Sequence, residues 1–286
     1  MEAEDDTWDR DIKMLKSEFL GKGAYGKIFK EDLNDRYVAV KYFFNNADDD
    51  KFKHEIHILE KLQNHYKQGF VRYFGYEQSP NRIVLECLEI TLFDFSRCEN
   101  TMYKDKDELC CAVLFSIINA LIFLNEKMHM FHMDIKESNI MLRGDQWVLI
   151  DFGACFETEA DNTIKDRVWP QNIIGTFCYQ PWEALLLADN WYKERPPTNI
   201  SLDTSLDSYC LAVTLFIIIT GYFPNGNYDS DIEKIPLMIN DVTRCKWKEE
   251  EQFKQSKLNG ILTKMLDLDQ NKRPWNSEIL FLLHQI

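Results

Sequence analysis

The sequence lacks cysteine pairs at metal-binding spacing, and it lacks an apolar leader at its start. Eight cysteines are spread over the 286 residues without a Cys-x-x-Cys pair, which argues against the usual zinc-ribbon arrangement. Several of them lie within apolar stretches, as reduced core cysteines do. The first six residues are acidic and polar, whereas a secretory leader has a basic start and an apolar run. We therefore expect an intracellular protein, cytoplasmic or nuclear or both.

Positive charge and long apolar runs are also scarce. Lys and Arg number 33 against 47 Asp and Glu, which gives a formal net charge of -14. Nucleic acids and anionic membranes are bound by basic faces, so we expect no nucleic-acid partner. The longest apolar runs, at residues 112–124 and 211–220, are shorter than the ~20 residues that span a bilayer. We interpret both as buried helices and expect no membrane insertion.

The first third of the chain is dominated by strand patterns. Residues 19–43 are rich in β-forming residues, with a compact strand signal at 37–43, and residues 71–76 and 82–88 repeat this character. Between these segments, residues 50–66 place apolar side chains at helical spacing.

From about residue 107 onward the patterns are mostly helical. A short strand pair near residues 141 and 147–150 interrupts them, and prolines mark a loop-rich section at about 181–197. Helices are expected over residues 109–130, 207–221 and 252–266. A small β-rich lobe thus precedes a larger helical lobe, with the boundary near residues 87–90, and ligands usually bind where two lobes meet.

A glycine-rich segment lies at the start of the β-rich part. Gly21, Gly23 and Gly26 follow the pattern G-x-G-x-x-G, and glycines let backbone approach phosphate oxygens without a Cβ in the way. A tight hairpin turn is an equally good interpretation of this segment alone. A strand follows it rather than a helix, which excludes a dinucleotide-binding fingerprint, and no Gly-Lys-Ser/Thr follows, which excludes a Walker loop.

Two charged residues come next at positions that allow them to meet. Lys41 ends the strand at 37–43, so its ammonium lies at the edge of a buried region. Glu55 lies on the following helix, free to face Lys41. For Lys41 alone, an ordinary lysine at a strand end is the simpler interpretation.

The strongest local signal is the pattern D-x-K-x-x-N within residues 131–141. Asp134 is suited to accept a hydroxyl proton, and Lys136 is suited to neutralise charge that develops on a phosphate. Asn139 can bind a metal through its amide oxygen. Asp151 begins an Asp-Phe-Gly triplet at the end of a short strand, where a carboxylate can hold Mg²⁺. An isolated triplet would be no more than a turn, but chance rarely produces Asn139 and Asp151 together at this separation.

In this order and spacing, the motifs resemble those of the eukaryotic protein kinase family, Ser/Thr type, over residues 15–286. Residues 1–14 form an acidic N-terminal extension. The resemblance implies an α+β fold with two lobes, a β-rich N-lobe with one main helix (about 15–88) and a mainly helical C-lobe (about 89–286).

The resemblance further implies ATP and Mg²⁺ as cofactors. Asp134 would be the catalytic base, Lys41 would pair with Glu55 and contact the α- and β-phosphates, and Asn139 and Asp151 would hold two Mg²⁺ ions. Leu85 would be the gatekeeper before the hinge. The other residues assigned to nucleotide binding are Gly21, Gly23, Ala24, Tyr25, Gly26, Ile28, Ala39, Glu86, Cys87, Leu88 and Met141.

The resemblance also assigns structural roles. Glu183 would form a buried ion pair with Arg273, and Asp207 would anchor the backbone of the catalytic loop. Lys136 together with Thr176 is similar to the Ser/Thr pattern, so a protein with a Ser or Thr acceptor is the expected substrate, and regulatory protein partners remain open. Leu59, Phe152 and His132 would form a packed column that links the lobes.

Two positions depart from the family pattern. Met133 stands where an Arg that reads a phosphate on the activation loop normally precedes the catalytic Asp. Although Thr158 and Thr163 lie in that loop, we predict that activity does not depend on its phosphorylation. Trp182 replaces the usual Pro of the Ala-Pro-Glu triplet, which puts ordinary peptide preferences in question. The alternative to an active enzyme is a pseudokinase acting as a scaffold or allosteric partner; a small-molecule or lipid kinase fits the motifs less well.

Overall fold

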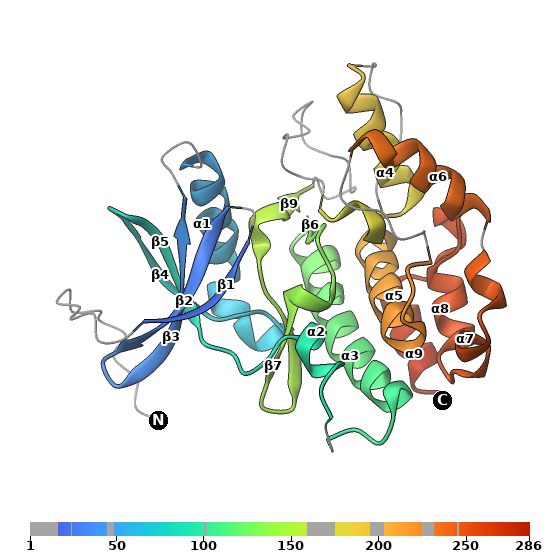
Figure 1. The fold of residues 1–286 in the computed structure, drawn as a ribbon, viewed down its shortest axis with the longest axis horizontal. Helices are drawn as coiled ribbons and strands as arrows, with labels where there is room; N and C mark the ends of the chain where they lie inside the picture. The colour runs from blue at the N-terminus through green and yellow to red at the C-terminus, as the bar shows by residue number, and fades with distance from the viewer. Residues whose placement is uncertain are drawn as a thin grey trace.

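The computed structural model describes residues 17–23, 25–44, 49–99, 102–158, 175–194, 203–224, 232–244 and 246–286. A sheet with one packed helix forms the N-terminal part, and a helical part with two short strand pairs follows it (Figure 1). This arrangement confirms the predicted α+β fold with a β-rich first lobe. The N-terminal extension at residues 1–14, Ala24 and Thr163 lie outside the described residues.

The N-terminal sheet has five antiparallel strands in the order β1-β2-β3-β5-β4. Its strands are β1 (Glu18–Lys22), β2 (Gly26–Leu33), β3 (Arg36–Phe43), β4 (Tyr73–Gln78) and β5 (Asn81–Glu86). In β3, Val38 and Val40 are buried with Val84 of β5 in one apolar cluster. Because successive side chains of a strand alternate between the two faces, Ala39 and Lys41 belong to the opposite face.

Helix α1 (Asp49–Leu62) packs against β4 and β5. Its first turn carries Asp49 and its last turn carries Lys61, the charge order that the helix dipole favours. The predicted helix at 50–66 is therefore confirmed over most of its length, and its end tightens into a 3₁₀ turn that stops at Gly69. Gly69 has φ of 103°, and a Cβ there would lie 2.8 Å from the Cβ of Ala120, so glycine is required on both counts.

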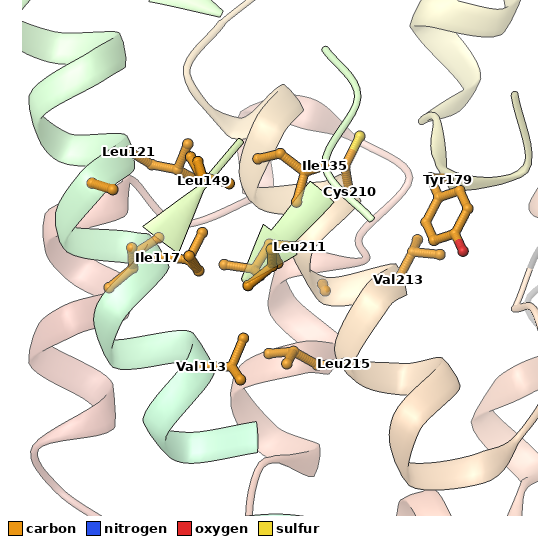
Figure 2. Close-up of a cluster of buried hydrophobic side chains, with 14 of the residues drawn as sticks. Val113, Ile117, Leu121, Ile135, Leu149, Tyr179, Cys210, Leu211, Val213 and Leu215 are labelled. Carbon is orange, nitrogen blue, oxygen red and sulfur yellow. The ribbon is translucent and has the colours of Figure 1, made fainter. Parts of the chain in front are cut away.

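The C-terminal lobe is built from helices around α5. Its helices are α2 (Leu92–Phe95), α3 (Lys106–Leu121), α4 (Trp182–Tyr192), α5 (Ser205–Thr220), α6 (Ile235–Arg244), α7 (Glu251–Gln255), α8 (Asn259–Met265) and α9 (Asn276–Leu283). All residues of α5 are buried, which matches a helix that is apolar on every side. Figure 2 shows Val113, Ile117 and Leu121 of α3 facing Leu211 and Leu215 of α5 across this core.

Two short strand pairs lie between the lobes' main elements. β7 (Ile140–Arg143) pairs with β8 (Gln146–Leu149), as predicted, and β6 (Met130–Phe131) pairs with β9 (Phe156–Glu157). Single-turn helices connect the remaining elements: Gln63–Gln68, Ile122–Lys127 (a π turn), Glu137–Asn139, Phe152–Ala154, Phe177–Tyr179, Ile232–Lys234, Lys246–Glu249 and Gln270–Lys272.

The helix that contains the first apolar run is longer than the run itself. α3 begins after Asp105, whose side chain accepts a hydrogen bond from the Glu108 N–H, and its π turn extends the helix to Lys127. By length and apolar composition alone, residues 106–127 would be able to cross a bilayer, a test that core helices of globular proteins also pass. In this fold one side of α3 packs on α5 and α9, which gives its apolar residues a partner within the chain.

Three predictions of helices need correction. The loop-rich section at 181–197 contains α4, because Pro181 stands directly before the helix, where proline does not interrupt hydrogen bonding. The predicted helix at 252–266 is divided into α7 and α8. The division occurs where the Asp107 carboxylate of α3 accepts hydrogen bonds from Ser256 Oγ at 2.7 Å and from the Lys257 N–H at 2.9 Å. Helices α2, α6 and α9 were not predicted.

Candidate active site

Lys41 of β3 lies between two carboxylates. Its Nζ donates to both oxygens of Glu55, at 2.9 and 2.8 Å, and to Oδ1 of Asp151 at 2.8 Å. The Lys41 and Glu55 side chains are buried, whereas that of Asp151 is 42% exposed. Three segments that are distant in sequence, β3, α1 and the segment that follows β8, therefore meet at one ammonium group.

The charges of this group are coupled. Burial by itself lowers the pKa of Lys41, but the nearby carboxylates of Asp151 and Glu55 raise that pKa above its ordinary value. Burial favours the neutral form of Asp151, yet the Lys41 charge holds the pKa of this carboxyl below its usual range. Burial raises the pKa of Glu55. Lys41 therefore stays protonated, and Asp151 stays ionised and partly open to solvent.

Asp134 is held by donors on three sides. Its Oδ1 accepts from the Thr176 N–H at 2.8 Å and from the Thr176 hydroxyl at 2.9 Å. Its Oδ2 accepts from Lys136 Nζ at 2.8 Å and from Asn139 Nδ2 at 2.9 Å. Lys136 also contacts Thr176 Oγ1 at 2.7 Å. The catalytic loop and the segment that precedes α4 are thereby joined at the carboxylate that we predicted to be the base.

Asn139 and Asp151 are brought next to each other by the backbone. The Ile150 N–H donates to the Asn139 carbonyl at 3.0 Å, and Asp151 follows with φ of 60° in the left-handed region. Because the amide nitrogen of Asn139 donates to Asp134, its amide oxygen remains for another partner. Amide and carboxylate oxygens are ligands that suit Mg²⁺. In the part of the chain that the structure describes, no group of three or more His, Cys, Asp or Glu side chains could hold a metal ion, so a metal at these two residues would also need oxygens from a bound phosphate.

The catalytic loop is anchored by a residue of α5. Asp207 accepts hydrogen bonds from the N–H groups of His132, at 2.8 Å, and Met133, at 3.0 Å, in the position expected of this residue. The sequence analysis missed Asn125, a fully buried residue that donates to Asp207 at 2.9 Å and to the Met130 carbonyl at 2.7 Å. An Asn at the end of an apolar run was the available signal.

Met133 departs from the family pattern and has a strained backbone. Its φ of 66° is in the left-handed region, which is unusual for a residue other than glycine. Its carbonyl accepts a hydrogen bond from Nε2 of the buried Gln180 at 2.5 Å. Gln180 is a second residue that sequence reasoning missed, and it ties the segment before α4 to the residue that precedes Asp134.

Most of the residues predicted to contact a nucleotide lie on or between β1, β2 and β3 and around the end of β5, whereas Met141 lies on β7. Ile28 pairs with Lys41 and Ala39 with Leu85 in the strand register, and Met141 forms an isolated bridge with Thr91. Leu85 and Leu88 are partly buried against the main core. Tyr25, which precedes β2, has its ring under the Lys51 ammonium.

Of the predicted hinge residues, Glu86 is hydrogen-bonded within the chain and Cys87 is partly buried. The Glu86 N–H donates to the Arg72 carbonyl at 2.9 Å, and its carboxylate accepts from Arg143 at 2.7 to 3.1 Å. Any contact of Glu86 with adenine must therefore use its carbonyl. Cys87 is half-buried, and burial raises the pKa of its thiol.

The glycines of the first motif differ in their surroundings. A Cβ on Gly26 would lie 2.3 Å from the Tyr42 carbonyl oxygen, so the backbone of β3 leaves no room for a side chain at this position. A Cβ on Gly21 or Gly23 would meet nothing within 4 Å. The described residues give no steric reason for these two glycines, and this leaves room for a ligand to approach the backbone.

The column predicted to link the lobes is present as packing. The rings of His132 and Phe152 meet edge to face with centroids 5.1 Å apart, and Leu59 belongs to the same buried cluster. His132 Nε2 is 3.0 Å from the Ile150 carbonyl oxygen. Because a carbonyl can only accept, Nε2 carries the hydrogen and donates this hydrogen bond.

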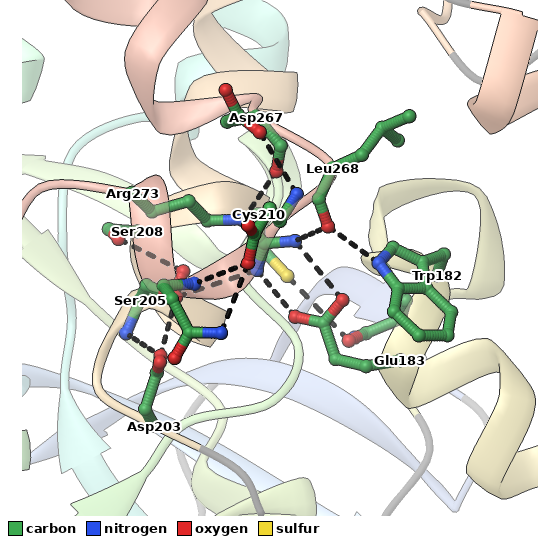
Figure 3. A network of polar contacts seen from close by, with 12 residues as sticks. Trp182, Glu183, Asp203, Ser205, Ser208, Cys210, Asp267, Leu268 and Arg273 are labelled. Carbon is green, nitrogen blue, oxygen red and sulfur yellow. Dashed lines mark hydrogen bonds and ion pairs between the residues drawn. The ribbon is translucent and has the colours of Figure 1, made fainter. Parts of the chain in front are cut away.

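The buried ion pair between Glu183 and Arg273 is also present. Arg273 Nη1 and Nη2 donate to the two carboxylate oxygens of Glu183. Trp182 lies beside the pair and donates from Nε1 to the Leu268 carbonyl at 2.6 Å (Figure 3). The unusual Trp therefore fastens the start of α4 to the loop after α8.

Gly175 is expected to tolerate no side chain. A Cβ at this position would lie 2.2 Å from the Met133 carbonyl oxygen and 2.8 Å from Oδ1 of Asp134. Gly175→Ala should therefore displace the loop that carries Asp134, and we expect the activity of this site in a steady-state assay to fall by at least tenfold. The matched control is Gly260→Ala in α8, where a Cβ meets nothing within 4 Å; it should keep full activity and add about 0.5–1 kcal/mol of helix stability. Equal activity of the two variants would contradict this reading of Gly175.

Comparison with known proteins identifies the family to which this two-lobed fold and this arrangement of residues belong. The sequence model of the protein kinase domain matches residues 14–281, so the chain belongs to the protein kinase family. It is 28% identical to the putative cysteine-rich receptor-like protein kinase 32 of Arabidopsis thaliana over 81% of the chain and 34% of that protein. It is 25% identical to the dual specificity mitogen-activated protein kinase kinase sek-1 of Caenorhabditis elegans, over 92% of the chain and 75% of that protein. The chain thus spans about a third of the length of these plant relatives; the share of each protein that it covers is between 29% and 38%.

Proposed function

We propose that the chain is an active protein kinase that transfers the γ-phosphate of Mg-ATP to a Ser or Thr hydroxyl of a protein. The observation that carries this proposal is the hydrogen bond from Ile150 to Asn139. It brings the Lys41, Glu55 and Asp151 cluster next to the Asp134 cluster. A proton acceptor, a metal-binding carboxylate and a buried cation then serve one site, an arrangement that plain core packing does not require.

Each residue has one task in the proposed reaction. The acceptor oxygen bonds to the γ-phosphorus of ATP while the bond from that phosphorus to the β,γ-bridging oxygen breaks, which releases ADP. Asp134 accepts the hydroxyl proton, Lys136 neutralises charge on the transferred phosphoryl group, and Lys41 binds the α- and β-phosphates. Asn139 and Asp151 would hold Mg²⁺, which when bound supplies positive charge to the phosphate oxygens.

Preference for Ser and Thr rests on the contact between Lys136 and Thr176. These side chains meet at 2.7 Å directly beside Asp134, so the acceptor must deliver its oxygen to a base that is closely flanked on both sides. A hydroxyl on a short side chain, close to the peptide backbone, suits this position. The test uses three peptides that differ only in carrying Ser, Thr or Tyr, with γ-labelled ATP and Mg²⁺.

We expect the Ser or Thr peptide to be labelled at least tenfold faster than the Tyr peptide. Comparable labelling of all three would indicate dual specificity, the property in the name of the sek-1 relative, and would overturn the Ser/Thr preference. If wild-type labelling equals that of Asp134→Ala, the chain is a scaffold rather than an enzyme. We also propose an intracellular location, cytoplasmic or nuclear, and interaction with regulatory proteins.

Thr158→Ala is expected to leave activity within about threefold of wild type. Thr158 is only 5% exposed, and both its N–H and its hydroxyl donate to the His129 carbonyl, at 2.8 and 3.2 Å. A hydroxyl that is buried and hydrogen-bonded is a poor phosphorylation site. The assay compares phosphatase-treated wild type and variant; a loss of more than tenfold in the variant alone would contradict the prediction. Thr163→Ala is the parallel test for a residue outside the described part of the chain.

A further inference from the structure

Three side chains on one face of α1 contact the segment that follows Asp151. His54, His57 and Lys61 are spaced so that they lie along the same side of the helix. His54 Nε2 donates to the Cys155 carbonyl at 2.6 Å. His57 Nε2 and Lys61 Nζ each take one oxygen of Glu157, at 2.8 and 2.5 Å. We refer to Glu157 with His57 and Lys61 as the α1–β9 latch.

The strand on the other side of the latch is itself fixed. In β9, Glu157 pairs with Met130 of β6, and Phe156 stacks on Phe131 with ring centroids 5.5 Å apart. The Thr158 N–H continues this pairing to the His129 carbonyl. β6 leads within three residues to Asp134. Glu157 therefore sits on a strand whose position is set by the catalytic loop.

The helix on the near side of the latch carries Glu55. Glu55 lies between His54 and His57 in the sequence, and its carboxylate is the one that binds Lys41. Any movement that draws α1 away from β9 must also draw Glu55 away from Lys41. The α1–β9 latch and the contact between Glu55 and Lys41 thus form in the same position of helix α1.

Charge favours the latch in this arrangement. Partial burial raises the pKa of Glu157, but Lys61 and His57 outweigh burial and hold that pKa below its ordinary value. A neutral imidazole still offers an N–H, so His57 can donate in either charge state. His57 is 56% exposed and Glu157 is 32% exposed, so each contact alone contributes little. Even a small bias shifts a helix that exchanges between two positions.

We propose that Glu157 is a positioning residue: its carboxylate holds α1 where Glu55 meets Lys41, and supplies from within the chain a charge that loop phosphorylation would otherwise add. This inference rests on the proposed kinase function for its consequence on rate, but the latch itself can be measured without catalysis. It gives a physical reason why Met133 can stand where a phosphate-reading Arg is usual, because the anion that organises α1 is already present.

The test is Glu157→Gln, which keeps the shape and removes the charge. Amide hydrogen exchange over residues 54–62 should become about three- to tenfold faster, which corresponds to roughly 0.6–1.4 kcal/mol at 1.36 kcal/mol per tenfold. The turnover number for phosphoryl transfer should fall by a similar factor, while the KM for the peptide and the melting temperature stay unchanged. A charge-exchanged variant, Glu157→Lys with Lys61→Glu, should recover most of both quantities.

Glu60→Gln is the matched control, because it makes the same change at an exposed position of the same helix. Unchanged hydrogen exchange in Glu157→Gln, or an equal change in Glu60→Gln, would overturn the proposal. Faster exchange with an unchanged turnover number would overturn the positioning role as well. If wild type transferred no phosphate, the proposed function would fail, and exchange in α1 would still decide whether the latch exists.

Discussion

Asp134→Asn is expected to reduce the rate of phosphoryl transfer by about 10²- to 10⁴-fold, the usual contribution of a positioned general base. The amide keeps the shape of the carboxylate but cannot accept a proton. It also turns one NH₂ group toward donors, since the carboxylate now accepts from Lys136, Asn139 and Thr176. The loss should appear in the turnover number, because nucleotide binding depends on other residues.

The measurement is steady-state transfer to a Ser peptide, with binding of a nucleotide analogue followed separately. Asp145→Asn is the control, because it makes the same replacement in the exposed turn between β7 and β8, and it should keep wild-type activity. If Asp134→Asn retained more than a tenth of the wild-type rate, Asp134 would not be the base.

Glu183→Gln is expected to lower the free energy of unfolding by about 3–5 kcal/mol, the cost of breaking a truly buried ion pair. The Arg273 side chain is fully buried and that of Glu183 is 3% exposed, so the guanidinium would keep its charge away from water. Burial lowers the pKa of Arg273, but the Glu183 carboxylate raises it above its ordinary value. The Asp267 carbonyl, which accepts from Nε at 2.7 Å, cannot replace a carboxylate (Figure 3).

Urea denaturation of purified protein measures this loss. Glu251→Gln is the control, because Glu251 pairs with Lys254 at 3.4 Å with side chains that are 76% and 42% exposed, and exposed pairs contribute about 0–1 kcal/mol. The double variant Glu183→Leu with Arg273→Met should be more stable than the sum of the single losses predicts, because no unpaired charge remains. Strict additivity of the two losses would show that the residues do not act as a pair.

Local patterns predicted the N-terminal lobe well. The compact strand signal at 37–43 and the helical spacing at 50–66 correspond to β3 and α1, because β-forming residues mark the strand and α1 buries one face of a helix whose sequence shows the matching period. The helices α6 and α9 gave weaker signals. α9 begins just after Pro274, and its capping box places Glu278 opposite the Trp275 backbone, a feature that depends on how the chain enters the helix.

The motif residues of the site were also readable, since each has a chemistry that few other residues share. Their neighbours were not. Asn125 donates to the Met130 carbonyl and to Asp207, and Gln180 donates to the Met133 carbonyl, and nothing in their local sequence indicates those partners. The latch residue Glu157 is one acidic side chain among 47, and only its contacts with α1 distinguish it.

By itself, the sequence determined the two-lobed α+β class, the order of the main strands and helices, and the identity of the candidate site residues. These properties follow from periodicity and side-chain chemistry, which are local. The family resemblance predicted that Lys41 meets Glu55 and that Glu183 meets Arg273, and the structure shows both contacts. Only the tertiary structure decided that Asp151 also meets Lys41 and that Glu157 meets α1. Such pairs join residues 14 to 110 positions apart, and their distances depend on how whole elements pack, which no local pattern encodes.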